Sequence, residues 1–172
     1  MADVNEEQAR WAAVHARVVE QEKLIGFERF DYDDAWAVGS ALVAAARGTG
    51  LPIVVSIVFG EQRVFHAAVA GSTAVNDDWV GYKINTVRRH NLSSYGVGSQ
   101  YRSEGRDFDA ESRYDNSRYA AAGGAVPIRV AGSLIGVIGI SGLPEADDHQ
   151  MVVDALASHR SRAIPAELRV GN

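Results

Sequence analysis

The sequence predicts an α/β protein of the α+β kind, in which a β-sheet is flanked by helices. Two stretches, 52–59 and 133–141, are apolar at almost every position, which is typical of strands covered on both faces. Four other segments carry apolar residues at helical spacing, and three of these begin with acids, which suit the positive end of a helix. We therefore expect helices on both sides of the sheet.

The amino-terminal part of the chain predicts helix, short strand and helix. The apolar residues of 6–23 recur at helical spacing, so this segment is expected to form an amphipathic helix. The apolar run 24–27 follows and is a candidate short strand. The segment 31–50 begins with acids and ends in Gly50, as a capped helix does.

The middle of the chain predicts a β-hairpin and another helix. The stretch 52–59 is rich in β-branched residues, and a turn sequence separates it from the second strand, 64–70. The next helix is expected at 76–92. Asn76 is its expected N-cap, because asparagine side chains accept hydrogen bonds from the first free amides of a helix.

The rest of the chain predicts a polar segment, a second hairpin and a last helix. Residues 93–119 are dense in tyrosine, serine, glycine, arginine and aspartate, which indicates a functional or interface loop, with a short helix around 107–116. A second hairpin is expected from 125–130 and 133–141. The last helix is expected at 143–159.

Three glycines near the second hairpin raise the question of a phosphate-binding loop. A dinucleotide fingerprint needs its glycines at the end of a strand and the start of a helix, whereas Gly136 and Gly139 lie inside the predicted strand and only Gly142 follows it. We expect these glycines to allow close approach of a helix, a neighbouring chain or a flat ligand. Alternation along the strand predicts that Leu134 and Ile138 share one face.

The junction after this strand, SGLPEADDH, reads as a helix start. Pro144 suits the first helical position, because its missing N–H costs nothing there. Glu145, Asp147 and Asp148 stand where the helix dipole favours negative charge. Acid–base chemistry by Asp147 or Asp148 is the alternative, and His149 is interpreted as a residue packed on the sheet.

Composition limits the classes of function. The chain has 172 residues, for which we expect one domain over 1–172, with an amino-terminal amphipathic helix and a short carboxy-terminal tail. A net charge of -5 argues against nucleic-acid and anionic-membrane partners, and the absence of cysteine excludes disulfides and thiolate metal sites. We expect no metal site. The polar start and short apolar runs predict a cytoplasmic protein.

Two blocks of sequence carry a family resemblance. The block GGAVPIRVAGSLIGVIGISGLPEADDH at 123–149 resembles the haem-degrading, HbpS/GlcG-like domain family. One branch of that family is also similar in a second block, FHAAVAGSTAVNDDWVGYKINTVRRHNLSSYGVG, at residues 65–98. The spacing between the two blocks fits that branch as well.

The resemblance implies a profilin-like, three-layer fold with an antiparallel sheet of about five strands. It also implies a homo-oligomer and, for some members, haem binding or degradation. Haem binding needs an axial donor, an apolar slot and basic groups for the propionates. No residue of this chain is assigned as a haem ligand by the resemblance, so the cofactor stays unknown, with haem as a candidate.

Four candidate ligand-binding residues are basic or titratable. His66, in the predicted strand 64–70, is either an iron or general-base donor or a half-buried, hydrogen-bonded histidine. Lys83, Arg88 and His90 belong to KINTVRRH, which is either an anion-binding patch or a set of cations that complement the helix dipole.

Four further candidates are aromatic or adjacent to aromatic residues. Trp79 lies one helical turn from Lys83, and Tyr95, Tyr101 and Arg102 lie in the polar segment. Each is either part of a ligand site or a core or interface residue. No GxSxG motif supports a serine nucleophile, and no catalytic residue is assigned.

Two functions remain as expectations. The first is a non-enzymatic oligomeric module that docks a protein partner, because tyrosine and arginine are enriched at interface hot spots. The second is binding of haem or a small anion, with weak redox or degrading activity. A crevice beside residues 79–102 is the place where a ligand is expected.

Overall fold

The computed structural model describes residues 2–111, 113–161 and 164–171. Its sheet consists of β1 (Val54–Phe59), β2 (Gln62–Ala68), β3 (Ala125–Val130) and β4 (Ser133–Ser141). The strands lie in the order β2-β1-β4-β3, and every neighbouring pair is antiparallel. Both predicted hairpins are confirmed, and the two strands that are apolar at almost every position are the central ones.

The described residues form four strands rather than the five expected, and the predicted strand at 24–27 accounts for the difference. Helix α1 (Ala2–Leu24) continues to Leu24 and leaves too few residues for a strand. Phe27 makes only an isolated parallel bridge with Val130. The α+β class holds nonetheless.

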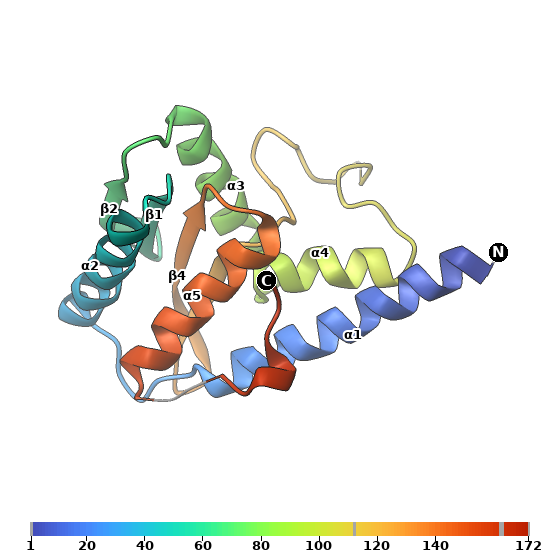
Figure 1. The fold of residues 1–172 in the computed structure, drawn as a ribbon, viewed down its shortest axis with the longest axis horizontal. Helices are drawn as coiled ribbons and strands as arrows, with labels where there is room; N and C mark the ends of the chain where they lie inside the picture. Colours follow the sequence, from blue (N-terminus) through green and yellow to red (C-terminus); the bar gives the residue numbers. More distant parts are fainter. Residues whose placement is uncertain (1, 112, 162–163, 172) are drawn as a thin grey trace.

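Helices cover both faces of the sheet, as the doubly apolar strands predict. Helices α2 (Tyr32–Thr49) and α5 (Glu145–His159) lie on one face, and α3 (Ala74–His90) lies on the other (Figure 1). The core under α2 and α5 includes fully buried Ile57 and Ile138. The smaller core under α3 includes Val54 and Val137.

A pair of helices extends beyond these three layers. Helix α1 and helix α4 (Ser94–Ser103) pack side by side, and the amino-terminal end of α1 projects away from the sheet (Figure 1). The short 3-10 helix Ala166–Leu168 returns to α1, where the side-chain amide of Gln21 donates to the carbonyl of Leu168 at 2.7 Å. No helix among the described residues is long and apolar enough to cross a membrane.

The helix ends follow the predicted signals with one correction. Asp31 caps α2 by accepting from the amides of Asp33 and Asp34, and Gly50 ends the helix in the left-handed conformation. The N-cap of α3 is Thr73 rather than Asn76. Asn76 stands three residues further on, where its side-chain oxygen accepts from the Thr73 amide at 2.9 Å, so it caps from inside the helix.

The glycines of β4 do allow close approach. A side-chain carbon at Gly139 would lie 3.2 Å from the Ile84 side chain of α3, and one at Gly136 would lie 2.4 Å from the Val58 carbonyl oxygen. Both glycines lie in the strand, so the phosphate-loop interpretation fails. Their absent side chains let α3 and the neighbouring strand pack directly against β4.

A β-bulge corrects the predicted face of one residue. The pairing Ile128 with Gly136 is followed by Arg129 with Leu134, so β4 carries Ile135 as an extra residue. Beyond the bulge the alternation inverts. Leu134 therefore packs with the α3 core, whereas Ile138 belongs to the core under α2 and α5.

The polar segment contains a helix, but not where the sequence predicts it. Helix α4 occupies Ser94–Ser103, and the described residues of 107–116 form turns. Gly96 and Gly98, which lower helix propensity in α4, are both buried against neighbouring atoms. Tertiary packing therefore outweighs local propensity in this segment.

Candidate functional site

A hollow of about 270 Å³ opens between α3, α4 and the segment that follows α4. We call it the crevice. Three predicted ligand-binding residues line it: Trp79 from α3, and Tyr101 and Arg102 from α4. The remaining lining consists of Gly98, Arg106, Asp107, Phe108, Asp109, Ala120, Ala121 and Ala122.

The chain closes the crevice by returning across α4 just before β3. A side-chain carbon at Gly98 would lie 2.0 Å from the Ala121 carbonyl oxygen, so the returning chain touches the helix backbone. The amide of Ala120 donates to the hydroxyl of Thr86 in α3 at 3.1 Å. These contacts fix the alanine wall of the crevice to both helices.

Stacked aromatic rings form a second wall. The Phe108 ring lies 5.2 Å from the Tyr101 ring, edge to face, and stacks on Tyr114 at 4.9 Å with an interplanar angle of 9°. Burial raises the pKa of Tyr101. Its phenol therefore stays neutral at physiological pH and is available as a hydrogen-bond donor.

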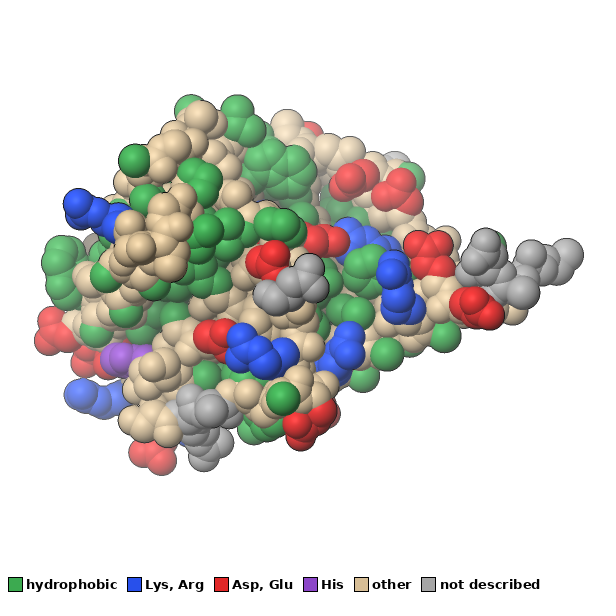
Figure 2. All heavy atoms as spheres, viewed as in Figure 1, with side chains coloured by type: hydrophobic (Ala, Val, Ile, Leu, Met, Phe, Trp, Pro, Cys, Tyr) green, Lys and Arg blue, Asp and Glu red, His purple; other side chains and the backbone are tan. Residues whose placement is uncertain are grey.

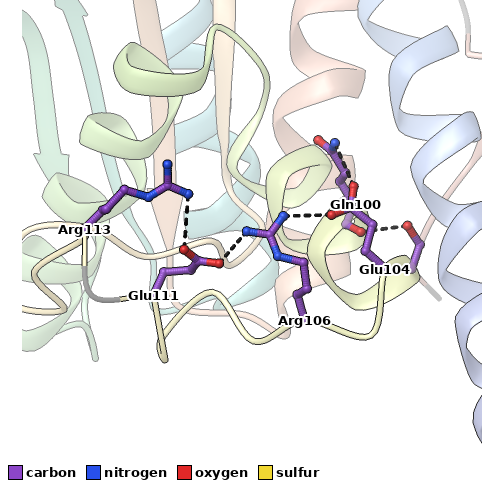
Figure 3. Close-up of polar contacts among 6 residues, drawn as sticks. Gln100, Glu104, Arg106, Glu111 and Arg113 are labelled. Carbon is purple, nitrogen blue, oxygen red and sulfur yellow. Dashed lines mark hydrogen bonds and ion pairs between the residues drawn. The ribbon is translucent and has the colours of Figure 1, made fainter.

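The two arginines of the crevice are held in place by carboxylates. Arg102 donates to both carboxylate oxygens of Glu145, at 2.8 and 3.2 Å, and lies 4.4 Å above the Trp11 ring. Arg106 lies between Glu104 and Glu111, as Figure 3 shows, and stacks 4.2 Å from the Tyr101 ring. Their hydrogen bonds with Arg106 lower the pKa of both glutamates.

The charges of the crevice are mixed rather than simply basic. Two guanidinium groups line it, but so do Asp107 and Asp109. Asp107 accepts from the Asp109 amide at 3.0 Å, which fixes the turn that carries both. Because each arginine is already paired with glutamate, the electrostatics favour a ligand with both a negative and a positive end over a simple anion.

Three predicted site residues lie elsewhere in the fold. His66 is exposed on β2, with its Nε2 atom 3.0 Å from the Asp77 carboxylate. Arg88 is exposed and donates to the Gly60 carbonyl. Because Lys83 is only 4% exposed, it does not line the crevice.

Lys83 belongs to a buried ion pair. Its ammonium lies 2.9 Å from the Asp148 carboxylate and donates to the Ile140 carbonyl at 3.2 Å. Asp148 also accepts from the Leu143 amide at 3.1 Å, so the pair ties α3 to the junction between β4 and α5. Burial raises the pKa of Asp148, and the Lys83 charge opposes this rise. We interpret the pair as structural.

The two remaining candidates are packed among aromatic rings outside the lining of the crevice. His90 packs its ring against Phe108 and Tyr114, at 5.9 and 5.3 Å, and burial and nearby Arg89 lower its pKa. Tyr95 is buried between Trp11 and His149. Neither residue is among those lining the crevice.

His149 lies in a buried polar cluster under α1. Its Nε2 atom is 2.8 Å from Gln21 Oε1, which acts as the acceptor because the Gln21 amide nitrogen already donates to Gln150 and Leu168. Burial lowers the pKa of His149 to about 3, so the imidazole is neutral. This cluster anchors the carboxy-terminal tail, since Gln150 also accepts from the Val170 amide at 2.8 Å.

The arrangement offers binding groups more than catalytic ones. Among the described residues, no group of three or more histidines, aspartates or glutamates is placed to hold a metal ion. His66, His90 and His149 lie on different elements and each has its own structural surroundings.

Several residues that line the crevice were not predicted from the sequence. Arg106, Phe108 and Ala121 come from irregular backbone, where no periodicity marks which side chains meet. The only available signal was the density of aromatic and arginine residues after α4.

Comparisons with known proteins identify the family of the chain. The model of the family described as "Haem degrading protein HbpS-like" matches residues 30–157. The UPF0303 protein SCO2848 of Streptomyces coelicolor is 45% identical over 142 residues, which cover 82% of this chain and 90% of the relative.

Solved structures agree with the fold. The Ybr137w protein has a TM-score of 0.78 and 27% identity, covering 86% of this chain and 87% of that one. A PduOC:heme complex has a TM-score of 0.65 and 22% identity, covering 75% and 94%. At that identity the second likeness concerns the fold alone.

Proposed function

The chain belongs to the HbpS-like haem degrading protein family, and from that premise we propose that it binds a small, single-ring molecule in the crevice. The observation that carries the proposal is the convergence of Trp79, Tyr101 and Arg102, from two helices, on one hollow. Binding pockets combine apolar and aromatic walls with a few convergent polar groups, and the crevice has this composition.

The charges of the lining define the ligand further. Arg102 and Arg106 suit a carboxylate, because a guanidinium group can form paired hydrogen bonds with it. Asp107 and Asp109 suit an ammonium group, and the Phe108 and Tyr101 rings suit a flat apolar body. We therefore propose a zwitterionic molecule with an aromatic ring as the ligand class.

Haem fits the crevice poorly. Drug-sized ligands occupy pockets of about 300–1,000 Å³, and the crevice measures about 270 Å³. Its described lining contains no histidine or methionine, and burial raises the pKa of Tyr101, which disfavours the phenolate that would ligate iron. The sequence-based expectation of haem therefore receives no support from this hollow.

Three probes that differ in their charged groups test the proposal. L-phenylalanine, 3-phenylpropanoate and 2-phenylethylamine share a ring and linker. We expect saturable binding that is strongest for phenylalanine and weaker for each probe that carries only one of its two charges. Isothermal titration calorimetry of the wild-type chain gives the readout, because it needs no reporter side chain and applies equally to every variant.

A haemin titration monitored by absorption spectroscopy tests the competing hypothesis, which is haem binding. No binding of any of the three probes, together with a saturable Soret shift, would contradict the crevice proposal and favour a haem site elsewhere in the protein. Equal binding of all three probes would contradict the proposed role of the charged lining.

A non-enzymatic module that self-associates is the second candidate function. Tyr32 and Trp36 on α2 are 60% and 68% exposed, although large aromatic side chains are normally well covered. They lie beside β2, one of the two edge strands of the sheet. The polar segment supports docking less well than the sequence indicated, because its Tyr101 and Tyr114 rings pack inward on Phe108.

Sedimentation velocity tests self-association directly. An assembly larger than one chain at micromolar concentration supports this second candidate, and a single-chain species over the whole accessible concentration range contradicts it.

A further inference from the structure

Helix α2 presents apolar surface on every side. Residues 35–46 contain no charged side chain, although several of them reach the surface. Its inner face packs Val38 and Leu42 into the core. A helix that is apolar all round is normally buried on all sides, so the outer face of α2 lacks the cover that its composition requires.

The outer face combines a protruding ring with a hollow. Trp36 is 68% exposed, and its ring meets the Phe65 ring edge to face at 5.8 Å. Beside it, a hollow of about 410 Å³ lies between α2 and α5, lined by Ala37, Ala41 and Met151 among others. Hydrophobic side chains reach the surface around these two helices in Figure 2. The outer face of α2 and its surroundings therefore offer exposed apolar surface to a partner.

Exposed side chains of opposite charge stand at the two ends of α2. The carboxylate of Asp33 and the guanidinium of Arg47 have no hydrogen-bond or ion-pair partner among the described residues, and both are exposed. Neighbouring Asp34 differs, because it is 2.8 Å from His159. The outer face thus has a free negative charge at its start and a free positive charge at its end.

Helical geometry places these charges on one line. Residues spaced alternately four and three apart follow one face of a helix. On α2 that line consists of Asp33, Ala37, Ser40, Ala44 and Arg47. When two such helices pair antiparallel with Ser40 at the twofold axis, each Asp33 faces the Arg47 of the other copy. In the same register Trp36 faces Ala44, so a large side chain meets a small one.

We propose that α2 forms a twofold interface with α2 of a second copy of this chain. The small side chains let the helices approach closely, the Trp36 ring packs against Ala44 of the other helix, and two ion pairs set the antiparallel register. The inference rests on the second candidate function, self-association, and is independent of ligand binding in the crevice.

A charge-swap series measured by sedimentation velocity tests the register. Asp33→Arg and Arg47→Glu each place like charges at both ends of the interface, and each should weaken association on the order of tenfold. The double variant Asp33→Arg/Arg47→Glu restores opposite charges and should recover the wild-type dissociation constant. Single variants without effect, or a double variant as weak as the singles, would overturn the proposal.

A matched pair of tryptophan variants tests the surface. Trp36→Ala should weaken association on the order of a hundredfold, because a buried tryptophan is a typical hot spot and the interface has two. Trp79→Ala removes an exposed tryptophan outside this surface and should leave association unchanged. Thermal unfolding of each variant checks that the fold is retained.

The outcomes separate the two proposals. Loss of assembly in Trp36→Ala with probe binding intact supports the interface, and loss of probe binding in Trp79→Ala with assembly intact supports the crevice. An assembly that survives Trp36→Ala, or a wild-type chain that sediments as a monomer, overturns the α2 interface and leaves the crevice proposal standing.

Discussion

The sheet and the crevice are built by different means. In the sheet, β1 and β4 are held by apolar side chains buried on both faces and by regular backbone pairing. In the crevice, irregular backbone is held by ion pairs such as Arg106 with Glu104, by stacked rings and by chain-to-helix contacts. The first region provides stability, and the second positions varied side chains around a hollow.

The largest expected effect tests the buried ion pair between Lys83 and Asp148, which ties α3 to the junction between β4 and α5. Asp148→Asn keeps an acceptor for the Leu143 amide but leaves the buried Lys83 ammonium unpaired. We expect it to lower the free energy of unfolding by about 3–5 kcal/mol. Urea denaturation measures the loss.

The matched control is the double variant Lys83→Met/Asp148→Asn, which removes the unpaired charge. Recovery of most of the lost stability supports a structural pair. Loss of probe binding in a stably folded double variant would instead give Lys83 a functional role.

The next prediction truncates a buried side chain of the sheet and asks whether the crevice is affected. Ile138 is fully buried at the centre of β4, under α2 and α5. Ile138→Ala should lower the free energy of unfolding by about 2–5 kcal/mol, through lost burial and the cavity left behind. Affinity for phenylalanine should stay as in the wild type, and a parallel loss of affinity at full folding would show that the regions are coupled.

A pH series probes the buried cluster around His149. The pKa of about 3 in the folded protein lies below the usual 6.5, so the unfolded state binds the extra proton between these values. Stability is therefore complete above pH 6.5 and falls as the pH decreases, by about 2 kcal/mol from this residue at pH 5.

Denaturation of wild type and His149→Gln at pH 7.5 and pH 5 isolates this contribution. The variant should lose less stability on acidification than the wild type does. The same pH dependence in both proteins would contradict a neutral buried imidazole.

The smallest effect on stability is expected in the crevice itself. Arg106 is exposed to solvent, and surface ion pairs add little to folding. Arg106→Gln should leave the urea midpoint unchanged and weaken phenylalanine binding several-fold, with less effect on phenylethylamine. A variant that unfolds early would show that Arg106 supports the fold and would remove it from the proposed site.

The regular parts of the fold could be predicted because their apolar residues recur with a period. The hairpins, the helices α1, α2, α3 and α5, and the close packing at Gly139 follow from such patterns, whereas α4 does not. The bulge at Ile135 could not be predicted, because it depends on pairing with β3. Nor could the end of α1 be distinguished from a strand at 24–27.

The candidate site was predictable only in part. Residue type and clustering pointed to Trp79, Tyr101 and Arg102, which do meet. The partner of Lys83 is 65 positions away, at Asp148, and no local pattern reveals that pairing. Likewise, Phe108 and Ala121 reach the crevice through turns, whose course depends on contacts with α3 and α4.

An NMR titration with L-phenylalanine tests the central claim most directly. The account predicts saturable changes in the backbone amide signals of residues 98–109 and 120–122 and in the indole signal of Trp79, with the signals of α2 unchanged. No saturable change at these positions, or changes confined to the hollow between α2 and α5, would contradict the crevice as the ligand site.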